Sequence, residues 1–306
     1  MDKKIVVLVG GTGHLGEKIA KELIAQGANV RALVRSGSNK AGLQKTGVTE
    51  FITGDMMNPT SLTIALSRSP KADAVVACAA GYTGHTKGDN QKIDTIGYRN
   101  LVNAAKAEKI PRFVLISILE CDKASEVPHF FHKFLVEQYL RAVDQPYIAL
   151  RAGAFLDQAK DYVYSKVQNG FYPAFVTGVS MGMIYTADLA RYAAMAATVV
   201  PDSELDKSVD VGWDKPVAGE DIAAAFSKVL GKNVVSKPAM PGFVTSFIMP
   251  VVSIFNESVK DMMAMMKWMR KGIYRSKNTA KQKELFSDLP TPEEAVRRYC
   301  KDKKLI

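Results

Sequence analysis

The sequence predicts an α/β fold: a doubly wound parallel sheet joined to a smaller, mostly helical C-terminal lobe. Three observations carry this prediction. Short aliphatic runs alternate with stretches of helical periodicity over the first half, a glycine series follows the first run, and the alternation loosens from about Arg151. The 306 residues, 47% hydrophobic and 24% charged, suffice for about two domains. The predicted domains are 1–156 for the sheet and 157–306 for the lobe, with segments near 183–215 returning to the sheet.

The first elements follow from their apolar patterns. The run Ile5–Val9 suits a strand buried on both faces. Leu15, Ile19 and Leu23 then recur at helical spacing and Gly27 stands where a helix C-cap belongs, so residues 16–26 are a predicted helix. Further strands are predicted at 30–34, 48–53, 74–78, 113–117 and 147–150, and further helices at 61–67, 96–108 and 130–143. Six strands alternating with helices predict parallel pairing with right-handed crossovers.

The second half returns to this alternation only twice, at 183–185 into 188–197 and at 209–211 into 221–230. A last helix is predicted to begin at Thr291-Pro292-Glu293-Glu294, which has capping-box spacing and proline at the first helical position. The apolar stretch 243–255 and the Met-rich stretch 262–269 predict either an adaptable surface for a hydrophobic ligand, or the core of the lobe or a subunit contact.

A basic face accompanies these apolar stretches. Its cations are Lys260, Lys267, Arg270, Lys271 and Arg275. We expect this face to meet water, with an anionic membrane or a protein partner as the alternatives.

The charge and cysteine content limit the class of protein. A formal net charge of +10 favours anionic partners such as phosphates, nucleic acid or acidic lipid headgroups. Specific nucleic-acid binding is not predicted, because no recognition motif accompanies the charge. Three cysteines are too few for a disulfide framework in a chain of this length, and no stretch reaches the ~20 apolar residues of a membrane span. We therefore expect a cytoplasmic protein, and the four histidines show no metal-site spacing.

A glycine series carries the first chemical signal. Gly10-Gly11-Thr12-Gly13-His14-Leu15-Gly16 lies between the first predicted strand and the first predicted helix. Glycines at such a turn let the backbone approach a pyrophosphate, and the helix N-terminus offers amides to the anion. The series predicts a dinucleotide site of the Rossmann type.

The end of the second strand indicates which dinucleotide binds. An NAD site places an acid about 20 residues after the glycines, whereas residues 23–49 contain no Asp or Glu. Arg35, followed by Ser36, instead stands where it can pair with a 2′-phosphate, and Lys40 follows. The prediction is NADP(H) rather than NAD(H), the alternative being that these cations are solvated loop charges.

These segments resemble a known family. The glycine series, the segment Val30-Arg31-Ala32-Leu33-Val34-Arg35, Gly54-Asp55 and the strand at 113–117 resemble, in order and spacing, the atypical short-chain dehydrogenase/reductases, and within them the NmrA-like and isoflavone-reductase-like group. The resemblance continues through 129–137, 150–155, 185–190 and 219–222. It spans most of the chain and is most specific in the first half.

The resemblance implies a catalytic set. Typical members use Ser with Tyr-x-x-x-Lys, in which the tyrosine moves a proton and the lysine holds the nicotinamide ribose. Here Lys133 matches the lysine, His129 stands in place of the tyrosine, and Ser117 ends the fifth strand near the place of the serine. Histidine, with an ordinary pKa of about 6.5, is a candidate general acid, while His132 is expected to be a surface or packing residue.

The remaining site residues are predicted from the same resemblance and from the strand ends. The cofactor site is predicted to comprise Gly10, Thr12, Gly13, His14, Leu15 and Gly16 in the loop; Arg35, Lys40, Asp55 and Met56 on the adenosine side; Cys78, Ala79 and Ala80 after the fourth strand; and Lys133, Ala152 and Phe155. Tyr82, Phe155 and Tyr162 are predicted to contact substrate. Cys78 is expected to line the cofactor passage rather than act as a nucleophile.

Two functions of different classes remain. The first is an NADP(H)-dependent oxidoreductase acting on a hydrophobic carbonyl, enone or quinone-like substrate. The second is a non-catalytic NADPH/NADP sensor acting through a regulatory protein partner, as is common among NmrA-like proteins with His at this position. The missing tyrosine favours the sensor and the apolar lobe favours the enzyme, toward which the sequence leans. A monomer and a homodimer are both compatible with it.

Overall fold

A computed structural model of the chain describes residues 3–81, 92–276 and 279–306. The chain forms two compact units. The first comprises Met1–Lys123, Pro128–Arg151 and Ala187–Val209, and the second Ala124–Val127, Ala152–Thr186 and Asp210–Ile306. The main chain therefore leaves and re-enters the first unit more than once.

One sheet organises the first unit. Within the described residues it has seven strands in the order β10-β6-β5-β4-β1-β2-β3. β1 lies near the middle and pairs in parallel with β2 and β4, so the strand order reverses beside it. The strands are β1 (Ile5–Val9), β2 (Asn29–Val34), β3 (Glu50–Thr53), β4 (Ala74–Ala77), β5 (Phe113–Ile118), β6 (Tyr147–Ala152) and β10 (Lys207–Val211). The predicted doubly wound parallel sheet is confirmed, with β10 as an added edge strand.

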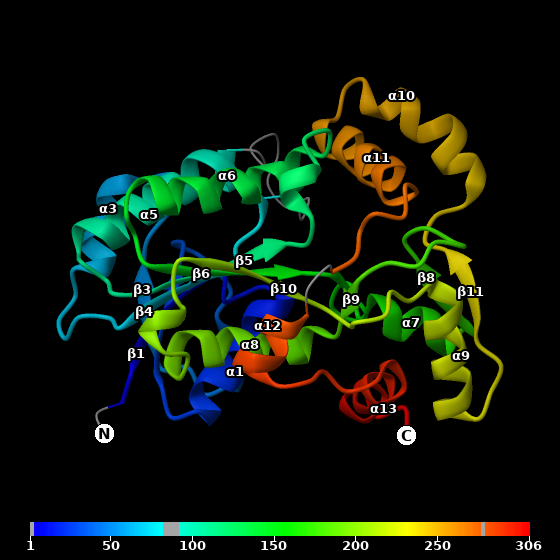
Figure 1. The fold of residues 1–306 in the computed structure, drawn as a ribbon, viewed down its shortest axis with the longest axis horizontal. Helices are drawn as coiled ribbons and strands as arrows, with labels where there is room; N and C mark the ends of the chain where they lie inside the picture. Colours follow the sequence, from blue (N-terminus) through cyan, green and yellow to red (C-terminus); the bar gives the residue numbers. More distant parts are fainter. Residues whose placement is uncertain (1–2, 82–91, 277–278) are drawn as a thin grey trace. The chain divides into compact units, whose positions relative to one another are not determined.

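Helices cover both faces of this sheet, as Figure 1 shows. On one face lie α1 (His14–Ala25) and α8 (Thr186–Thr198); on the other lie α3 (Pro59–Leu66), α5 (Tyr98–Ala107) and α6 (Pro128–Ala142). The apolar side chains of α3, α5 and α6 pack on the sheet around Val75, Leu101 and Leu140, all fully buried. This burial on both faces explains why β1 and β4 are uninterrupted aliphatic runs.

Two helical segments of the first unit differ from the sequence prediction. Helix α2 (Ala41–Lys45) was not predicted, because its five residues bury only Leu43 and cannot show a helical period. A single π-helical turn, Ile93–Gly97, leads directly into α5. That turn places Asp94, 2% exposed, toward the interior of the unit.

The second unit contains short strands and helices. β7 (Ala154–Phe155) pairs with β9 (Met183–Ile184), and β8 (Phe171–Ala174) pairs with β11 (Val235–Pro238), both in parallel. The helices are α7 (Tyr162–Gln168), α9 (Gly219–Leu230), α10 (Met249–Ser253), α11 (Glu257–Met269), α12 (Ala280–Phe286) and α13 (Pro292–Asp302). The predicted capping box of α13 is confirmed: the Thr291 amide donates to the Glu294 carboxylate at 2.8 Å, and the Glu294 amide donates to Thr291 Oγ1 at 3.3 Å.

The core of this unit uses only part of its apolar sequence. The Phe226 ring packs between those of Tyr172 and Tyr299, with ring centres 5.9 and 5.8 Å apart. Trp268 is also in the core and is 1% exposed. Of the alternatives predicted for the stretch 243–255, a place in the core holds for Met249, which is buried, and does not hold for Phe243, Phe247 and Phe255, which are exposed. No helix in the described part of the chain has both the length and the apolar content to cross a bilayer.

Candidate active site

The glycine loop forms a turn that only glycine can make at two positions. Gly10 has φ +87°, and a Cβ on it would lie 2.5 Å from the amide nitrogen of Ala79. A Cβ on Gly16 would lie 2.3 Å from the carbonyl oxygen of Gly10. Gly13 is the N-cap of α1 and offers the first amides of the helix no side-chain acceptor. The loop therefore folds tightly at the end of β1, against the end of β4, and leads directly into the N-terminus of α1.

A pocket of about 390 Å³ opens beyond β2 and β3. Val9 is in register with Leu33, and Val34 with Thr53, so this pocket and the glycine loop both lie at the carboxyl ends of the parallel strands, which we call the carboxyl edge of the sheet. Its lining consists of Arg35, Ser36, Gly37, Ser38, Thr53, Gly54, Asp55, Asn58 and Ser61. Hydroxyl, amide and guanidinium donors thus surround the cavity. The carboxylate in its lining belongs to Asp55 and accepts from the Met57 amide at 2.8 Å.

The other cations of this region have separate surroundings. Arg31 is buried, forms an ion pair with Glu50 at 2.8 Å and donates to the Pro70 carbonyl at 2.6 Å. Lys40 lies with its Nζ 5.3 Å from the centre of the Phe51 ring, outside the pocket lining. Arg35 is consequently the cation that the structure places in the pocket wall.

The end of β4 connects the glycine loop to Lys133. Cys78 Sγ donates to the Val9 carbonyl at 3.3 Å, and burial raises the pKa of its thiol to about 12, so the thiol stays protonated. The next residue, Ala79, lies against Gly10, and its carbonyl accepts from Lys133 Nζ at 3.1 Å. Cys78, Ala79 and Lys133, each predicted from sequence, are therefore brought together.

Lys133 is held by a cluster that sequence reasoning missed. Its ammonium forms a buried ion pair with Asp94 at 3.0 Å and lies 3.9 Å from the centre of the Tyr98 ring. Burial opposes the charged form, but the Asp94 carboxylate and Tyr98 outweigh it and raise the pKa of Lys133 above its ordinary 10.5. Asp94 also accepts from the Gly81 amide at 3.0 Å. Lys133 is thus a fixed cation in this part of the site.

His129 lies one helical turn before Lys133 on α6 and is 9% exposed. Its ring meets that of Phe130 edge-on at 4.6 Å. Tyr98, whose ring lies against the Lys133 ammonium, is fully buried, and its hydroxyl donates to the Ala79 carbonyl at 2.6 Å. Burial raises the pKa of Tyr98 to about 12, so this hydroxyl is not placed to exchange protons with a substrate.

Ser117 belongs to a second buried cluster, one turn further along α6. Its Oγ donates to Glu137 at 2.5 Å, and Arg151 binds the same carboxylate with two nitrogens, at 2.7 and 3.1 Å. Ser208 also donates to Glu137, at 2.8 Å. Glu137 is 1% exposed, so this cluster satisfies a buried charge and connects β5, α6 and β6.

The other predicted site residues are spread more widely. In the loop Thr12 is exposed and Leu15 buried, while Met56 is buried and its carbonyl accepts from Asn100 at 2.9 Å. Three predicted residues belong to the second unit: Ala152, whose carbonyl accepts from Tyr274; Phe155, on β7; and Tyr162, whose hydroxyl donates to the Ala239 carbonyl. Tyr82 lies outside the described residues. No group of three metal-binding side chains occurs in the described part of the chain.

Comparisons with known proteins show which proteins this chain is similar to. The model of the NmrA-like family matches residues 1–294. Photosystem II assembly factor Ycf39 of Synechocystis sp. is 29% identical over 231 residues, which cover 74% of this chain and 68% of that protein. NAD(P)H azoreductase of Xenophilus azovorans is 25% identical over 234 residues, covering 75% of each chain.

Two solved structures have the same fold. Citrobacter sp. triphenylmethane reductase superposes with a TM-score of 0.74 at 21% identity, covering 97% of this chain and 99% of that one. The NADPH-dependent quinone oxidoreductase QOR2 of Escherichia coli, complexed with NADPH, gives a TM-score of 0.72 at 20% identity, covering 96% and 99%. The predicted fold class is confirmed by this likeness.

Proposed function

Because the chain belongs to the NmrA-like family, we propose that it binds NADP(H) and reduces a hydrophobic carbonyl, enone or quinone-like substrate with it. The relatives support this class of reaction, since they include an NAD(P)H azoreductase by sequence and an NADPH-dependent quinone oxidoreductase by structure. When bound, the cofactor supplies the hydride. The protein has to bind it, orient the substrate and deliver a proton.

One observation carries the choice of NADP(H): the pocket beyond β2 and β3 has Arg35, Ser36 and Ser38 in its wall. A guanidinium with neighbouring hydroxyl donors suits a dianionic phosphate, whereas an NAD site needs a carboxylate acceptor for the ribose hydroxyls. Asp55 does not fill that role, because it follows β3 rather than β2 and its carboxylate accepts from the Met57 amide. The glycine loop on the same sheet edge supports binding of the pyrophosphate.

The proposed proton donor is His129. Ser117 donates to a buried carboxylate and Tyr98 donates to a backbone carbonyl, so neither hydroxyl is directed to a substrate. A ring nitrogen of His129 would give its proton to the substrate oxygen as the carbonyl carbon is reduced, which completes the alcohol. Lys133, permanently charged, supplies positive charge beside the cofactor ribose and has a binding role.

Replacement of Arg35 by alanine tests the cofactor assignment. We expect Arg35→Ala to weaken NADPH binding roughly 10- to 100-fold, because a charge-assisted bond to phosphate contributes about 1.5–3 kcal/mol. NADH, which lacks the 2′-phosphate, should bind the variant and the wild type equally. Arg68→Ala, an exposed arginine between α3 and β4, is the matched control and should change neither constant. Fluorescence titration measures both; an equal loss for NADPH and NADH would refute the assignment.

Turnover tests the catalytic part. NADPH oxidation is followed over a panel of quinones, enones and aldehydes, with His129→Ala expected to lower kcat about 10²- to 10⁴-fold while NADPH still binds. His132→Ala, on the same helix, is the control and should retain activity. Unchanged turnover in His129→Ala would remove His129 from the proposed mechanism.

A sensor is the second candidate, favoured by one specific observation: a histidine stands one turn before Lys133, where typical catalytic members have tyrosine. The similarity to photosystem II assembly factor Ycf39 is in keeping with it. Tight NADPH binding with no turnover over the whole panel would favour this candidate over the reductase.

A further inference from the structure

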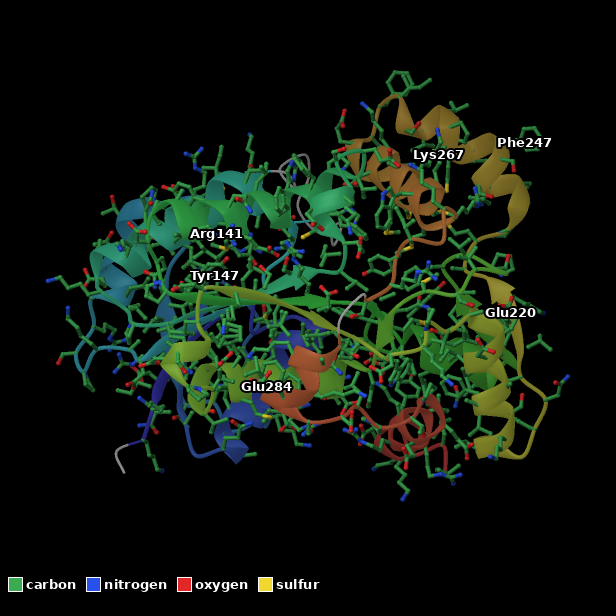
Figure 2. All side chains as sticks on the ribbon, viewed as in Figure 1. Arg141, Tyr147, Glu220, Phe247, Lys267 and Glu284 are labelled. Carbon is green, nitrogen blue, oxygen red and sulfur yellow. The ribbon has the colours of Figure 1, made fainter. Side chains whose placement is uncertain are left out.

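The second unit has an apolar surface that its own core does not use. The large exposed side chains on the segment 243–255 are Phe243, Phe247, Ile248, Val251, Val252, Ile254 and Phe255, between 39% and 86% exposed. They extend over the π-helical turn Val244–Ile248 and α10, and we refer to them as the apolar tip. Figure 2 shows the Phe247 side chain projecting away from the ribbon here. Contiguous exposed apolar surface of this kind marks an interaction site.

The tip is not an unfilled part of the unit's core. α10 packs against α11, to which it is adjacent in Figure 1, and Met249, Met265, Trp268 and Met269 are the buried apolar side chains of these two helices. The exposed side chains recur at positions 243, 247, 251 and 255, so they form the opposite, outward side of the segment. Both sides are apolar, but only one is covered.

The apolar tip has no charged residues, and most of the exposed charges that follow or precede it are cations. From Ala239 to Asn256 the sequence contains no Asp, Glu, Lys or Arg, so the exposed surface of this segment carries no charged side chain. The exposed cations nearest to it in the sequence include Lys237 before the segment and, within and just after α11, Lys260, Lys267, Arg270 and Arg275. Of the acids in α11, Asp261 is buried and Glu257 lies 4.0 Å from Lys260.

An uncharged apolar segment bordered by cations matches one kind of partner best. At the surface of an anionic bilayer the apolar side chains enter the boundary between headgroups and acyl chains, while Lys and Arg contact the lipid phosphates. A second copy of the chain fits less well, because a two-fold contact through this face would set the same cations against each other. The described helices are too short to span, so the segment would lie in the interface.

We propose that residues 243–255 dock the protein on an anionic lipid bilayer, with the apolar tip inserted and the cations of α11 against the headgroups. This differs from our sequence-based expectation that the basic face meets water. Docking through the second unit requires neither cofactor binding nor turnover.

Co-flotation of the full chain with lipid vesicles tests this proposal. We expect the protein to float with vesicles of equal parts phosphatidylcholine and phosphatidylglycerol, less as salt rises, and to bind weakly to phosphatidylcholine alone. Phe247→Ser/Phe255→Ser, at positions 75% and 86% exposed, should bind the anionic vesicles at least about tenfold more weakly without loss of stability. The matched control Ile64→Ser/Val199→Ser removes apolar side chains that are 65% and 62% exposed in the first unit and should bind as the wild type does.

The contribution of the cations is tested with a second double variant. Lys267→Gln/Arg270→Gln is expected to weaken binding to the anionic vesicles about tenfold and to flatten the salt dependence. The proposal is overturned if the wild type does not float, or if the serine double variant floats undiminished. It is also overturned if the wild type is a dimer that does not bind vesicles and the serine double variant is a monomer. The apolar tip would then be the contact with a second copy of the chain. NADPH titration of the same variants should be unchanged, which separates failure of docking from failure of the proposed function.

Discussion

Replacement of Lys133 by methionine is expected to lower the free energy of unfolding by about 3–5 kcal/mol, because it leaves a carboxylate buried without its cation. Asp94 and Lys133 have side chains 3% and 6% exposed, so their charges are compensated by each other, by the Tyr98 ring beside Lys133 and by nearby backbone groups. In Lys133→Met, Asp94 keeps the Gly81 amide and loses its charge partner. Urea unfolding measures the change, and NADPH binding should be lost with it.

A matched variant isolates burial as the cause. Lys4 forms an ion pair with Asp73 at 3.2 Å, but the two side chains are 54% and 35% exposed, so Lys4→Met should cost less than about 1 kcal/mol. Asp94→Asn/Lys133→Met removes both charges, and its loss should be smaller than the sum of the single losses. A strictly additive double variant would show that the two groups do not stabilise each other.

The pH dependence of this effect has a defined sign. The pKa of Lys133 is raised above its ordinary 10.5, so the folded state binds this proton more tightly than the unfolded state does. Its contribution is fully present below that ordinary value and is lost as pH rises through the higher folded-state value. The Lys133 proton should therefore add no pH dependence to the stability of the wild type from about pH 6 to about pH 9, which urea unfolding at several pH values measures.

The second large effect is expected at Gly16, where alanine should abolish cofactor binding. The added Cβ would lie 2.3 Å from the Gly10 carbonyl oxygen and 2.6 Å from Gly11 Cα, both backbone atoms that can move only if the loop moves. A displaced loop can no longer hold a pyrophosphate against the N-terminus of α1. We expect NADPH affinity to fall at least about a hundredfold, equivalent to about 2.7 kcal/mol.

Gly13→Ala is the matched change within the same loop. Gly13 has φ −84°, and the nearest atom to its added Cβ would be 3.4 Å away, so the loop should keep its conformation and the protein its thermal stability. Gly16→Ala protein that binds NADPH as the wild type does would contradict the role assigned to the loop. Isothermal titration and thermal unfolding of both variants give the comparison.

The fold was largely predictable because its strands are buried on both faces. Runs such as Ile5–Val9 and residues 74–77 are apolar at every position, which is typical of strands buried on both faces. Pairings of very short strands were not predictable: Met183–Ile184 joins β7 through two residues, a length without a period. The exposure of the apolar tip was also not predictable, since an apolar stretch reads alike whether it is covered or not.

The site was predictable where one motif contains it. The glycine series and Arg35 stand next to strands that the sequence marks, so their position at one sheet edge followed from parallel pairing. Asp94 was not predictable, because it meets Lys133 across 39 residues and no spacing rule connects a π-helical turn to α6. The partnership of Ser117 with Glu137 depends likewise on how α6 packs against β5.

The order of strands has a consequence for synthesis. β6 ends at Ala152, but its outer neighbour β10 begins only at Lys207, after the chain has passed through part of the second unit and α8. Until that later segment emerges from the ribosome, β6 presents unpaired amide and carbonyl groups along a hydrophobic edge. A nascent or truncated chain that stops between these two strands therefore has an unpaired, aggregation-prone edge at β6, which β10 covers in the full-length chain.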